Sequence, residues 1–494
     1  MKFLPLLTSL VLLASPALAQ WSTASLSLAR RDLAAASTDH VALFAGGSVT
    51  PNRISVDAVD LYDARTGTWS TSSLSVPRQF ASATAVGDRI LVAGGVTSND
   101  MGTDRVDVYD VATATWSIAS LSQPRVRPAA ATVDRFAVFA GGTDSLFGVA
   151  SDTVDVYDAV TGQWSVANLP FPVSFAEAAP VGDRVLIVDG NGFRDHLLLD
   201  PRSGVSTRIP RPANETAYIV ATVLGADDRF WIAGGYTSGS FQSPLDALRE
   251  YDLATGTWST SPLSEARGGT GASRTATRLV VAGGLRGSFP GFSSTATVDL
   301  FDVVDGTRTT ATLSAPRVRP ATVEVDGRVL IAGGFEETGS QGADSAAVDI
   351  FDDRVGSSYC APAVPNSTGA PAELRVEGAP GAVSIGRVAL VATGVPEASA
   401  GYFLVSQMQD LVPNAGGSQG TLCLGGGIGR YSQTPFFAPF GGRVELTIDL
   451  AAVPSPTGPV AVQPGESWRF QAWYRDANPG PTTNFTSAVE VLFQ

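Results

Sequence analysis

The sequence predicts an all-β protein in which seven small antiparallel sheets form a ring and a smaller β-sandwich follows. A set of marks recurs about every 45 to 50 residues between residues 21 and 355, which is typical of stacked copies of one supersecondary unit. Each copy reads as four short strands between turn signals. Beyond residue 355 the marks stop, but alternating apolar runs continue, so further strands are expected there.

Residues 74–121 show the marks of one unit. In chain order they are Pro77-Arg78, Gly94-Gly95 at the end of an apolar run, Tyr109-Asp110, and Trp116. The glycine doublet recurs at Gly46-Gly47, Gly141-Gly142, Gly234-Gly235, Gly283-Gly284 and Gly333-Gly334, and Asp189-Gly190 occupies the missing place in the series. The doublet positions therefore predict seven sheets.

The four strands of this unit are expected at residues 81–86, 89–93, 105–109 and 115–119. The first is built from Ala, Ser and Thr, which suits an innermost strand because little room is left near the axis of a ring. The doublet is expected where the backbone turns tightly or approaches a neighbour too closely for a Cβ atom. Tyr109 and Trp116 supply the bulk that fills the wedge between adjacent sheets.

The order of these marks resembles the kelch motif, and the resemblance covers about residues 21–355. It implies a seven-bladed kelch-type β-propeller, which we expect at residues 20–355. The Trp series begins at Trp21, ahead of the first doublet, whereas Ser358 stands at the expected Trp position of the last unit. We therefore predict that the strand near Trp21 completes the blade that contains Phe351 and removes an unpaired sheet edge.

The fourth unit departs from the motif. It has Asp189-Gly190, Leu199-Asp200 and Val205 in place of the three marks, so its sheet is expected to form with less bulk. His196 begins the third strand of this unit, and His40 precedes an apolar strand of the first unit. A structural role is favoured for both histidines, because neither has the companion residues of a nucleophile elbow.

Residues 356–494 are predicted to form a β-sandwich, with strands near 387–392, 443–449, 468–473 and 488–493. This part is similar to an accessory C-terminal domain of exported bacterial proteins that begins Tyr-Cys and carries Trp-Tyr-Arg-Asp, a likeness that assigns no activity. The two cysteines of the chain, Cys360 and Cys423, both lie here. In an exported protein they are expected to form a disulfide rather than a redox pair.

The first 19 residues are predicted to be an export signal. Lys2 precedes an apolar run at residues 4–13, and small residues at 17–19 form a cleavage site. The mature chain would begin at Gln20 and be secreted, periplasmic or located at the cell surface. No later run has the roughly 18 apolar residues of a membrane-spanning helix. The net charge of −14 argues against a nucleic-acid partner.

In kelch proteins the channel mouth commonly binds partners, and the residue two places after the leading arginine of each unit often points into it. This resemblance implies ligand-binding positions at Asp32, Phe80, Arg127, Phe175, Glu215 and Arg319, with Gly269 at the corresponding place of the sixth unit. The leading arginines are predicted to be structural, bonding carbonyl groups or acids between blades: Arg78, Arg125, Arg267 and Arg317.

For Arg127 and Arg319, which stand in identical Pro-Arg-Val-Arg-Pro stretches, structural and ligand-binding roles both stay open. Arginine is suited to the second role because its planar guanidinium binds carboxylates through two parallel hydrogen bonds. Aromatic residues in the loops between second and third strands could bind sugar rings or could cap small apolar clusters: Phe147, Tyr236, Phe241, Phe289, Phe292 and Phe335.

The favoured function is that of an exported, non-catalytic recognition scaffold that binds a glycan or a surface protein through one propeller face. The alternative is an enzyme acting on acidic sugars, as some exported kelch propellers do, with Arg127 and Arg319 holding a carboxylate and Glu215 or Asp32 serving as acid or base. A purely structural role in the envelope is the third reading.

Copper radical oxidases built on this fold need two histidines, two tyrosines and a cross-linked cysteine. Both cysteines of this chain lie beyond the propeller, so that chemistry is excluded. We therefore expect no catalytic residue, no metal site and no cofactor. The expected partner is a glycan or protein ligand, and the chain is expected to be a monomer.

Overall fold

The computed structural model of the chain describes residues 20–494 except 99, 191–193, 212–217, 220, 221, 227, 238–242, 289, 290, 338–341, 379–386 and 479. The predicted export signal at residues 1–19 lies outside the described residues. Within them, strands dominate, and the regular helical structure is a single 3₁₀ turn at Ala415–Gly417. The described part contains no helix of the length and apolarity needed to cross a membrane.

Seven four-stranded antiparallel sheets, here called blades 1 to 7, lie within the described part of residues 21–352. Blades 1 to 4 are, from the axis outward, β2 (Ala34–Ser37), β3 (Val41–Ala45), β6 (Ala58–Asp63) and β7 (Thr68–Ser73); β8 (Ser82–Val86), β9 (Arg89–Ala93), β10 (Thr103–Asp110) and β11 (Thr115–Arg125); β12 (Ala129–Val133), β13 (Phe136–Ala140), β14 (Ser151–Asp158) and β15 (Gln163–Val173); and β16 (Glu177–Val181), β17 (Arg184–Val188), β18 (His196–Leu199) and β19 (Ser206–Ile209).

Blades 5 to 7 continue the pattern. They are β21 (Thr222–Gly225), β22 (Arg229–Ala233), β24 (Ala247–Asp252) and β25 (Thr257–Pro262); β26 (Gly271–Arg274), β27 (Arg278–Ala282), β30 (Thr297–Asp302) and β31 (Arg308–Thr312); and β32 (Ala321–Val325), β33 (Arg328–Ala332), β36 (Ala347–Asp352) and β1 (Trp21–Ser25). Small hairpin sheets lie between second and third strands: β4 (Ser48–Val49) with β5 (Ile54–Ser55), β28 (Leu285–Arg286) with β29 (Ser293–Ser294), and β34 (Phe335–Glu337) with β35 (Gly342–Asp344). Another short sheet joins β20 (Tyr218–Ile219) to β23 (Tyr236–Thr237).

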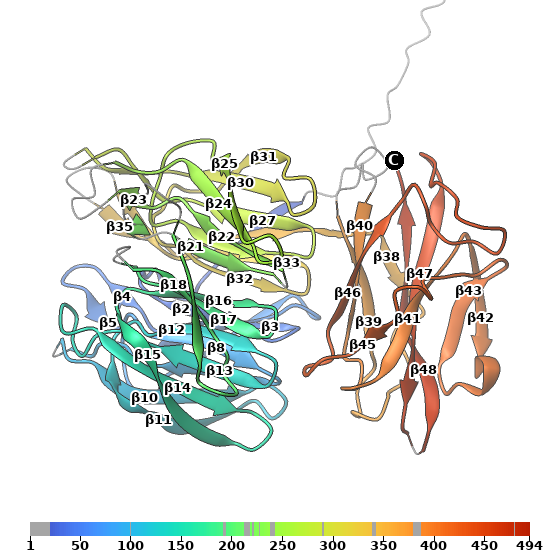
Figure 1. The fold of residues 1–494 in the computed structure, drawn as a ribbon, viewed down its shortest axis with the longest axis horizontal. Coiled ribbons are helices and arrows are strands. Elements are labelled where there is room, and N and C mark those ends of the chain that lie inside the picture. The colour runs from blue at the N-terminus through green and yellow to red at the C-terminus, as the bar shows by residue number, and fades with distance from the viewer. Residues whose placement is uncertain are drawn as a thin grey trace, which may run out of the picture.

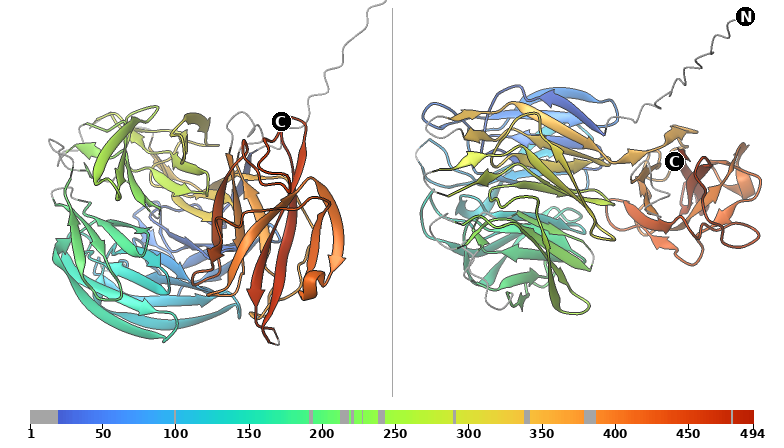
Figure 2. Two further views of the ribbon diagram at one scale, coloured as in Figure 1. Left: turned by 45° about the vertical axis from the view of Figure 1, so that its right-hand side comes forward. Right: turned by 90° about the horizontal axis from the view of Figure 1, so that it is seen from above.

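The blades close into a ring, which Figures 1 and 2 show as a sequence of colours from blue to orange around one axis. Each innermost strand contacts the next, in the order β2, β8, β12, β16, β21, β26, β32 and back to β2. The predicted latch is confirmed, because β1 pairs with β36 and places Trp21 opposite Phe351. Their rings lie 5.3 Å apart, so the N-terminal strand covers the edge that blade 7 would otherwise leave open.

The glycine doublets join each blade to the next. The amide of Gly95 donates to the carbonyl oxygen of Arg125, at 2.9 Å, and a Cβ atom on Gly94 would lie 2.5 Å from that oxygen. Both glycines have positive φ, of 65° and 102°. The doublet is therefore required by the backbone conformation and by the close approach of Arg125, at the end of β11 where the chain leads into the next blade.

The leading arginines Arg78, Arg125, Arg267 and Arg317 are structural, as predicted, but their acidic partners lie on the blade that each arginine leads into; Arg30 has the same role in blade 1. Each side chain is fully buried, contacts a buried aspartate on the third strand of its blade, and also donates to carbonyl oxygens of that blade. The pairs are Arg30 with Asp60, Arg78 with Asp107, Arg125 with Asp155, Arg267 with Asp299, and Arg317 with Asp349. Because every such charge is paired inside the protein, these arginines hold the connections between blades in place.

Blade 4 forms despite its missing marks, since β16 to β19 pair as a complete sheet. His196 is buried there beside Phe230 and Trp258, and burial lowers its pKa to about 3. This neutral imidazole within an aromatic cluster agrees with the structural role expected for His196. The bulk that blade 4 lacks is thus supplied by aromatic residues of blade 5.

The C-terminal part contains two facing sheets with one apolar core. One sheet is β37 (Arg354–Val355), β39 (Glu373–Glu377), β40 (Arg387–Thr393) and β46 (Val444–Asp449). The other is β38 (Ser357–Tyr359), β48 (Thr482–Leu492), β47 (Ser467–Asp476), β41 (Ala400–Ser406) and β44 (Gly429–Arg430), with β45 (Phe436–Phe437) beside β41. A separate hairpin, β42 (Met408–Pro413) and β43 (Thr421–Gly425), carries Cys423, which is joined to Cys360 by a disulfide.

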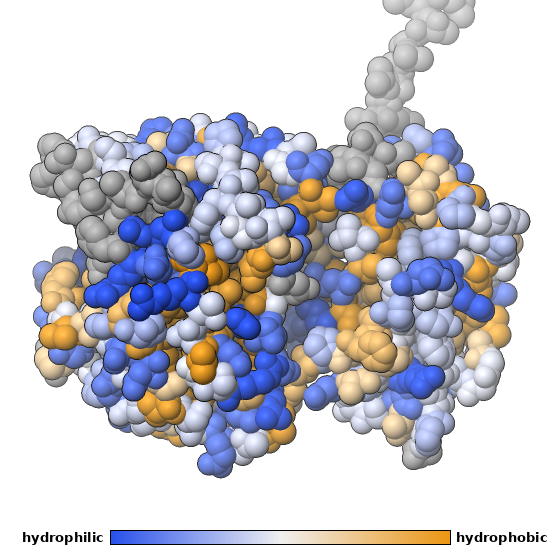
Figure 3. Space-filling model, in the orientation of Figure 1, coloured by the Kyte–Doolittle hydropathy of each residue, from blue (hydrophilic) through white to orange (hydrophobic). Residues whose placement is uncertain are grey.

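The C-terminal sandwich packs on the end of the propeller where first and second strands are joined, opposite the small hairpins β4, β5, β23 and β35 (Figure 1). Arg443 lies 3.1 Å from Glu324 of blade 7, and Glu377 accepts a 2.7 Å hydrogen bond from the amide of Ala276 in blade 6. A cavity of about 1000 Å³ remains between the two parts, visible as a hollow in Figure 3. The opposite end of the propeller is thus left uncovered by the sandwich.

Candidate functional site

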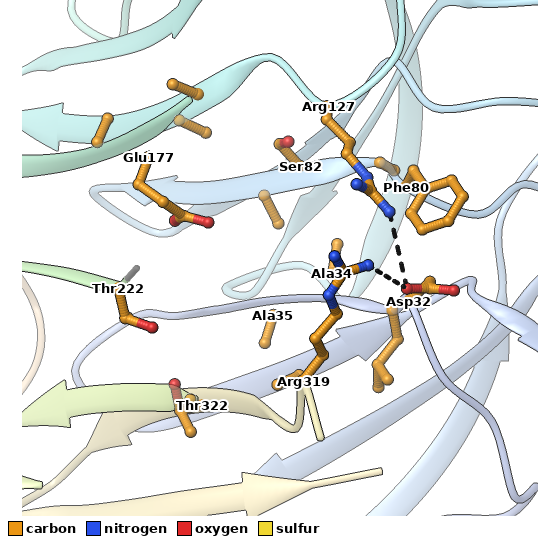
Figure 4. Close-up of a pocket in the computed structure, with 18 of the residues that line it drawn as sticks. Asp32, Ala34, Ala35, Phe80, Ser82, Arg127, Glu177, Thr222, Arg319 and Thr322 are labelled. Atoms are coloured by element: carbon orange, nitrogen blue, oxygen red, sulfur yellow. Dashed lines mark ion pairs between the residues drawn. The ribbon is translucent and has the colours of Figure 1, made fainter. Parts of the chain in front are cut away.

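A cavity of about 410 Å³ lies on the propeller axis, and we call it the axial cavity. It is lined by the first residues of the seven innermost strands and by the segments that lead into them (Figure 4). The small side chains of Ala34, Ser82, Ala129, Gly271 and Ala321 leave this space open, as the composition of the innermost strands suggested. The cavity therefore follows from the taper of the ring.

Five of the six predicted ligand-binding residues line the axial cavity: Asp32, Phe80, Arg127, Phe175 and Arg319. Gly269 occupies the corresponding place in blade 6. Glu215, the sixth, lies outside the described residues. The structure thus brings together residues from blades 1, 2, 3, 4 and 7, whose role in binding stays a prediction.

All of these positions have a left-handed backbone, which L-residues other than glycine rarely adopt. The φ angles are 55° at Asp32, 56° at Phe80, 50° at Arg127, 49° at Phe175, 63° at Gly269 and 49° at Arg319. The backbone amides at these turns donate hydrogen bonds to the preceding blade. The amide of Arg127 donates to the carbonyl oxygen of Phe80, and the amide of Arg319 donates to the carbonyl oxygen of Gly269. The left-handed turn is therefore a feature of every one of these blade connections, and in blade 6 glycine adopts it without strain.

Two guanidinium groups converge on one carboxylate at the centre of the site. Arg127 lies 3.9 Å and Arg319 3.8 Å from Oδ1 of Asp32, as the dashed lines in Figure 4 show. Neither guanidinium donates a hydrogen bond to a residue that the structure describes, although each carries five N–H donors. In this they differ from the leading arginines, whose guanidinium groups donate hydrogen bonds to carbonyl oxygens of the protein.

Arg127 is held between aromatic rings. Its guanidinium carbon lies 3.6 Å from the ring centroid of Phe80 and 5.2 Å from that of Phe175, which are favourable cation–π distances. Burial, followed by the charge of Arg319, lowers the pKa of Arg127 from its ordinary value. A second anion at this place would relieve the repulsion between the two guanidinium groups.

Glu177 is the residue that the sequence prediction missed. It begins β16, at the place where the other innermost strands have Ala, Ser, Thr or Gly, and its side chain is exposed to the axial cavity (Figure 4). Burial raises the pKa of Glu177 to about 7, although the charges of Arg127 and Arg319 oppose this shift. The signal was available, because a glutamate at the start of an otherwise small-residue strand is out of pattern.

Hydroxyl groups complete the lining. Thr222 and Thr322 each donate a 2.7 Å hydrogen bond to a backbone oxygen, of Thr270 and Ala272 respectively, and keep their lone pairs as acceptors. The site therefore offers guanidinium donors for an anion, hydroxyl acceptors for the hydroxyl groups of a ligand, and one carboxyl group that can exchange a proton near neutral pH.

The loop aromatics have mixed roles. Phe147 is 85% exposed, whereas Tyr236 is buried and donates from its hydroxyl to the carbonyl oxygen of Leu285. Phe292 packs edge-on against Tyr236, and Phe335 lies beneath Arg31. Phe241 and Phe289 lie outside the described residues. Capping of loop clusters thus describes Tyr236, Phe292 and Phe335 better than sugar stacking does.

Residues 77–120, which span blade 2, match the family model described as "Kelch motif". Among solved structures, the chain is similar to the one titled "Structure of YjhT", with 15% sequence identity, 66% of this chain and 95% of that chain covered, and a TM-score of 0.44. No curated protein matches the chain. The matched motif belongs to one of seven units, six of which carry the glycine doublet, and the seven units fold into the seven blades; the chain is a kelch-repeat β-propeller protein.

Proposed function

We propose that this protein is an exported, non-catalytic recognition scaffold that binds a small carboxylate-bearing sugar in the axial cavity. The observation that carries the proposal is the pair Arg127 and Arg319, whose guanidinium donors converge on the cavity without a hydrogen-bonded partner among the described residues. Arginine side chains bind carboxylates through paired, charge-assisted hydrogen bonds. Asp32 holds both cations in place but lies too far away to use their donors.

The shape of the site favours a sugar over a protein surface. A cavity of about 410 Å³ is in the range of small-molecule sites, whereas specific protein interfaces are broad and shallow. The hydroxyl oxygens of Thr222 and Thr322 can accept hydrogen bonds from the hydroxyl groups of a sugar. Because many functions share the propeller fold, the proposal rests on this site and not on the fold.

Isothermal titration calorimetry tests the proposal with a panel of carboxylated sugars, beginning with D-glucuronate, and with the neutral counterpart D-glucose. We expect a carboxylated sugar to bind and its neutral counterpart not to bind. Arg127→Ala/Arg319→Ala should weaken binding by at least about 100-fold, the loss of two charge-assisted contacts of about 1.5–3 kcal/mol each. Arg184→Ala/Arg202→Ala removes the same charge from the opposite face and should bind normally.

Failure of every carboxylated sugar to bind, or equal binding by the Arg127→Ala/Arg319→Ala variant, would overturn the proposal. The thermal melts of the two double variants should be compared first. Neither double variant removes one of the buried leading arginines, so both variants are expected to fold.

A second function is supported by Glu177, whose pKa of about 7 suits a general acid–base group. An acidic sugar held by Arg127 and Arg319 could exchange anomers if Glu177 accepted the proton of the anomeric hydroxyl while the bond from the anomeric carbon to the ring oxygen broke and water protonated the ring oxygen. The open-chain aldehyde would then rotate and reclose through the reverse proton transfers to give the other anomer. Nuclear magnetic resonance of freshly dissolved α-D-glucuronate distinguishes the two functions. An enzyme accelerates the exchange and loses this acceleration in Glu177→Gln with binding retained, whereas a scaffold leaves the spontaneous rate unchanged.

A further inference from the structure

The charged groups of the axial cavity are equal in number but unequally paired. Its described lining contains two cations, Arg127 and Arg319, and two carboxyl groups, Asp32 and Glu177. Asp32 is close to both guanidinium groups, and its side chain is only 7% exposed. Glu177, in contrast, has no hydrogen-bonded or ion-paired partner among the residues that the structure describes. One of the two carboxyl groups is therefore uncompensated.

Among the residues that the structure describes, the elements packed against Glu177 supply no other charge to stabilise its ionised form. It pairs with Val188 in β17, and the adjacent innermost strands β12 and β21 present Ala129 and Thr222 at the cavity. Asp189, which follows β17, accepts a hydrogen bond from the backbone of Ser174. The charged groups that act on Glu177 are Arg127 and Arg319 across the cavity, and their attraction is weaker than the cost of burial.

A bound carboxylate would change this balance. Lying at the two guanidinium groups, it would add a negative charge close to Glu177 and compete with it for the same cations. Two carboxylates that share one enclosed site resist simultaneous ionisation, so one of them retains a proton. With Glu177 neutral, the two guanidinium groups of Arg127 and Arg319 face one ion-paired carboxyl group, that of Asp32, and a bound monocarboxylate supplies the second negative charge.

We propose that the axial cavity binds its carboxylate ligand together with one proton, which Glu177 holds. This inference rests on the proposed function and adds a regulation to it, since ligand affinity then falls as the medium becomes alkaline. The protonated carboxyl group also becomes a hydrogen-bond donor toward a ligand oxygen. When the pH rises and Glu177 ionises, its carboxylate repels the bound anion and favours release of the ligand.

The experiment is calorimetric titration of the full chain with D-glucuronate, or with the tightest carboxylated sugar of the panel, between pH 6 and pH 8. If only the form with neutral Glu177 binds, the competent fraction falls from about 0.9 to about 0.1 over this range, and Kd rises about tenfold. Repeating the titration at pH 8 in two buffers with different ionisation enthalpies measures the proton directly. We expect the uptake of nearly one proton for each ligand.

Glu177→Gln should bind at pH 8 as the wild type does at pH 6, with no proton uptake and no change of Kd with pH. Glu336→Gln, a carboxyl removal outside the axial cavity, should keep the pH dependence of the wild type. A wild-type Kd that is constant from pH 6 to pH 8, with no proton uptake, overturns this inference and leaves the proposed function standing. Absence of binding at every pH overturns the proposed function itself.

Discussion

The backbone of the axial cavity yields a prediction about stability. Phe175 and Arg319 have φ of 49° each, while Gly269 meets the same turn in blade 6 with φ of 63°. A side chain in this conformation is strained by contact between its Cβ atom and the backbone. Replacing Phe175 and Arg319 with glycine should therefore stabilise the propeller relative to replacing them with alanine. The alanine variant is the matched control, because it also lacks the ring and the guanidinium group.

The magnitude follows from two opposing contributions. Relief of the left-handed strain is worth about 1–2 kcal/mol at each position. Glycine also makes the unfolded chain more flexible, which offsets about 0.4–1 kcal/mol of this gain. The net advantage of glycine over alanine is about 0.5–1 kcal/mol for each residue. Because the two residues belong to different blades, the double glycine variant should gain about 1–2 kcal/mol.

Urea denaturation followed by tryptophan fluorescence measures this difference as a shift of the transition midpoint between Phe175→Gly/Arg319→Gly and Phe175→Ala/Arg319→Ala. Both variants should lose affinity for the carboxylated sugar relative to the wild type, so the difference in stability between them is not accompanied by a difference in binding. Equal midpoints would show that the strain at these turns is no larger than the flexibility that glycine adds to the unfolded chain, which would refute the expected gain. A less stable glycine variant would show that flexibility of the unfolded chain dominates.

Three further changes test the architecture. Deletion of residues 21–27 removes the five paired residues of β1 and should destabilise the ring by about 3 kcal/mol, which a thermal melt with and without this segment detects; an unchanged melt would reject the latch. Asp299→Asn leaves the fully buried Arg267 without its ionic partner and should cost about 3–5 kcal/mol in chemical denaturation, whereas a neutral effect would mean that the pair is dispensable. Burial and the charge of Glu377 raise the pKa of Asp353 to about 7, so the free-energy cost of its ionisation in the folded state is absent in acid, grows from about pH 4 to pH 7 and is complete above pH 7. Asp353→Asn should therefore be more stable than the wild type at pH 8 but not at pH 4. A constant difference in stability between the two pH values would contradict this.

Much of the fold is encoded in short, local segments of the sequence. Six units contain their own strands, turn residues and doublet, and Asp189-Gly190 keeps the spacing of the seventh, so the sequence predicts seven sheets without any knowledge of long-range contacts. The latch was also predictable, because Trp21 supplies the mark that the last unit lacks. The fold of blade 4 was predicted from its place in the period, although its own marks are absent.

The site was only partly predictable. The kelch resemblance indicated which position of each unit faces the channel, and five of those residues do line the axial cavity. Glu177 was missed because the repeat pattern predicts a small residue at its position, and a residue that differs in one unit only does not show up as a repeat. A repeat pattern also could not predict the contacts of the sandwich with Glu324 and Ala276, because the sandwich lies outside the repeats.

The sequence by itself determined the repeated unit, the number of blades and the closure of the ring, because these depend on short segments that recur at a fixed spacing. Only the tertiary structure decided that Arg127 and Arg319, on blades 3 and 7, meet at one oxygen of Asp32, with Glu177 across the same cavity. The physical reason is that the curvature of the closed ring, which sums the packing of all seven sheets, sets the distances across the axis.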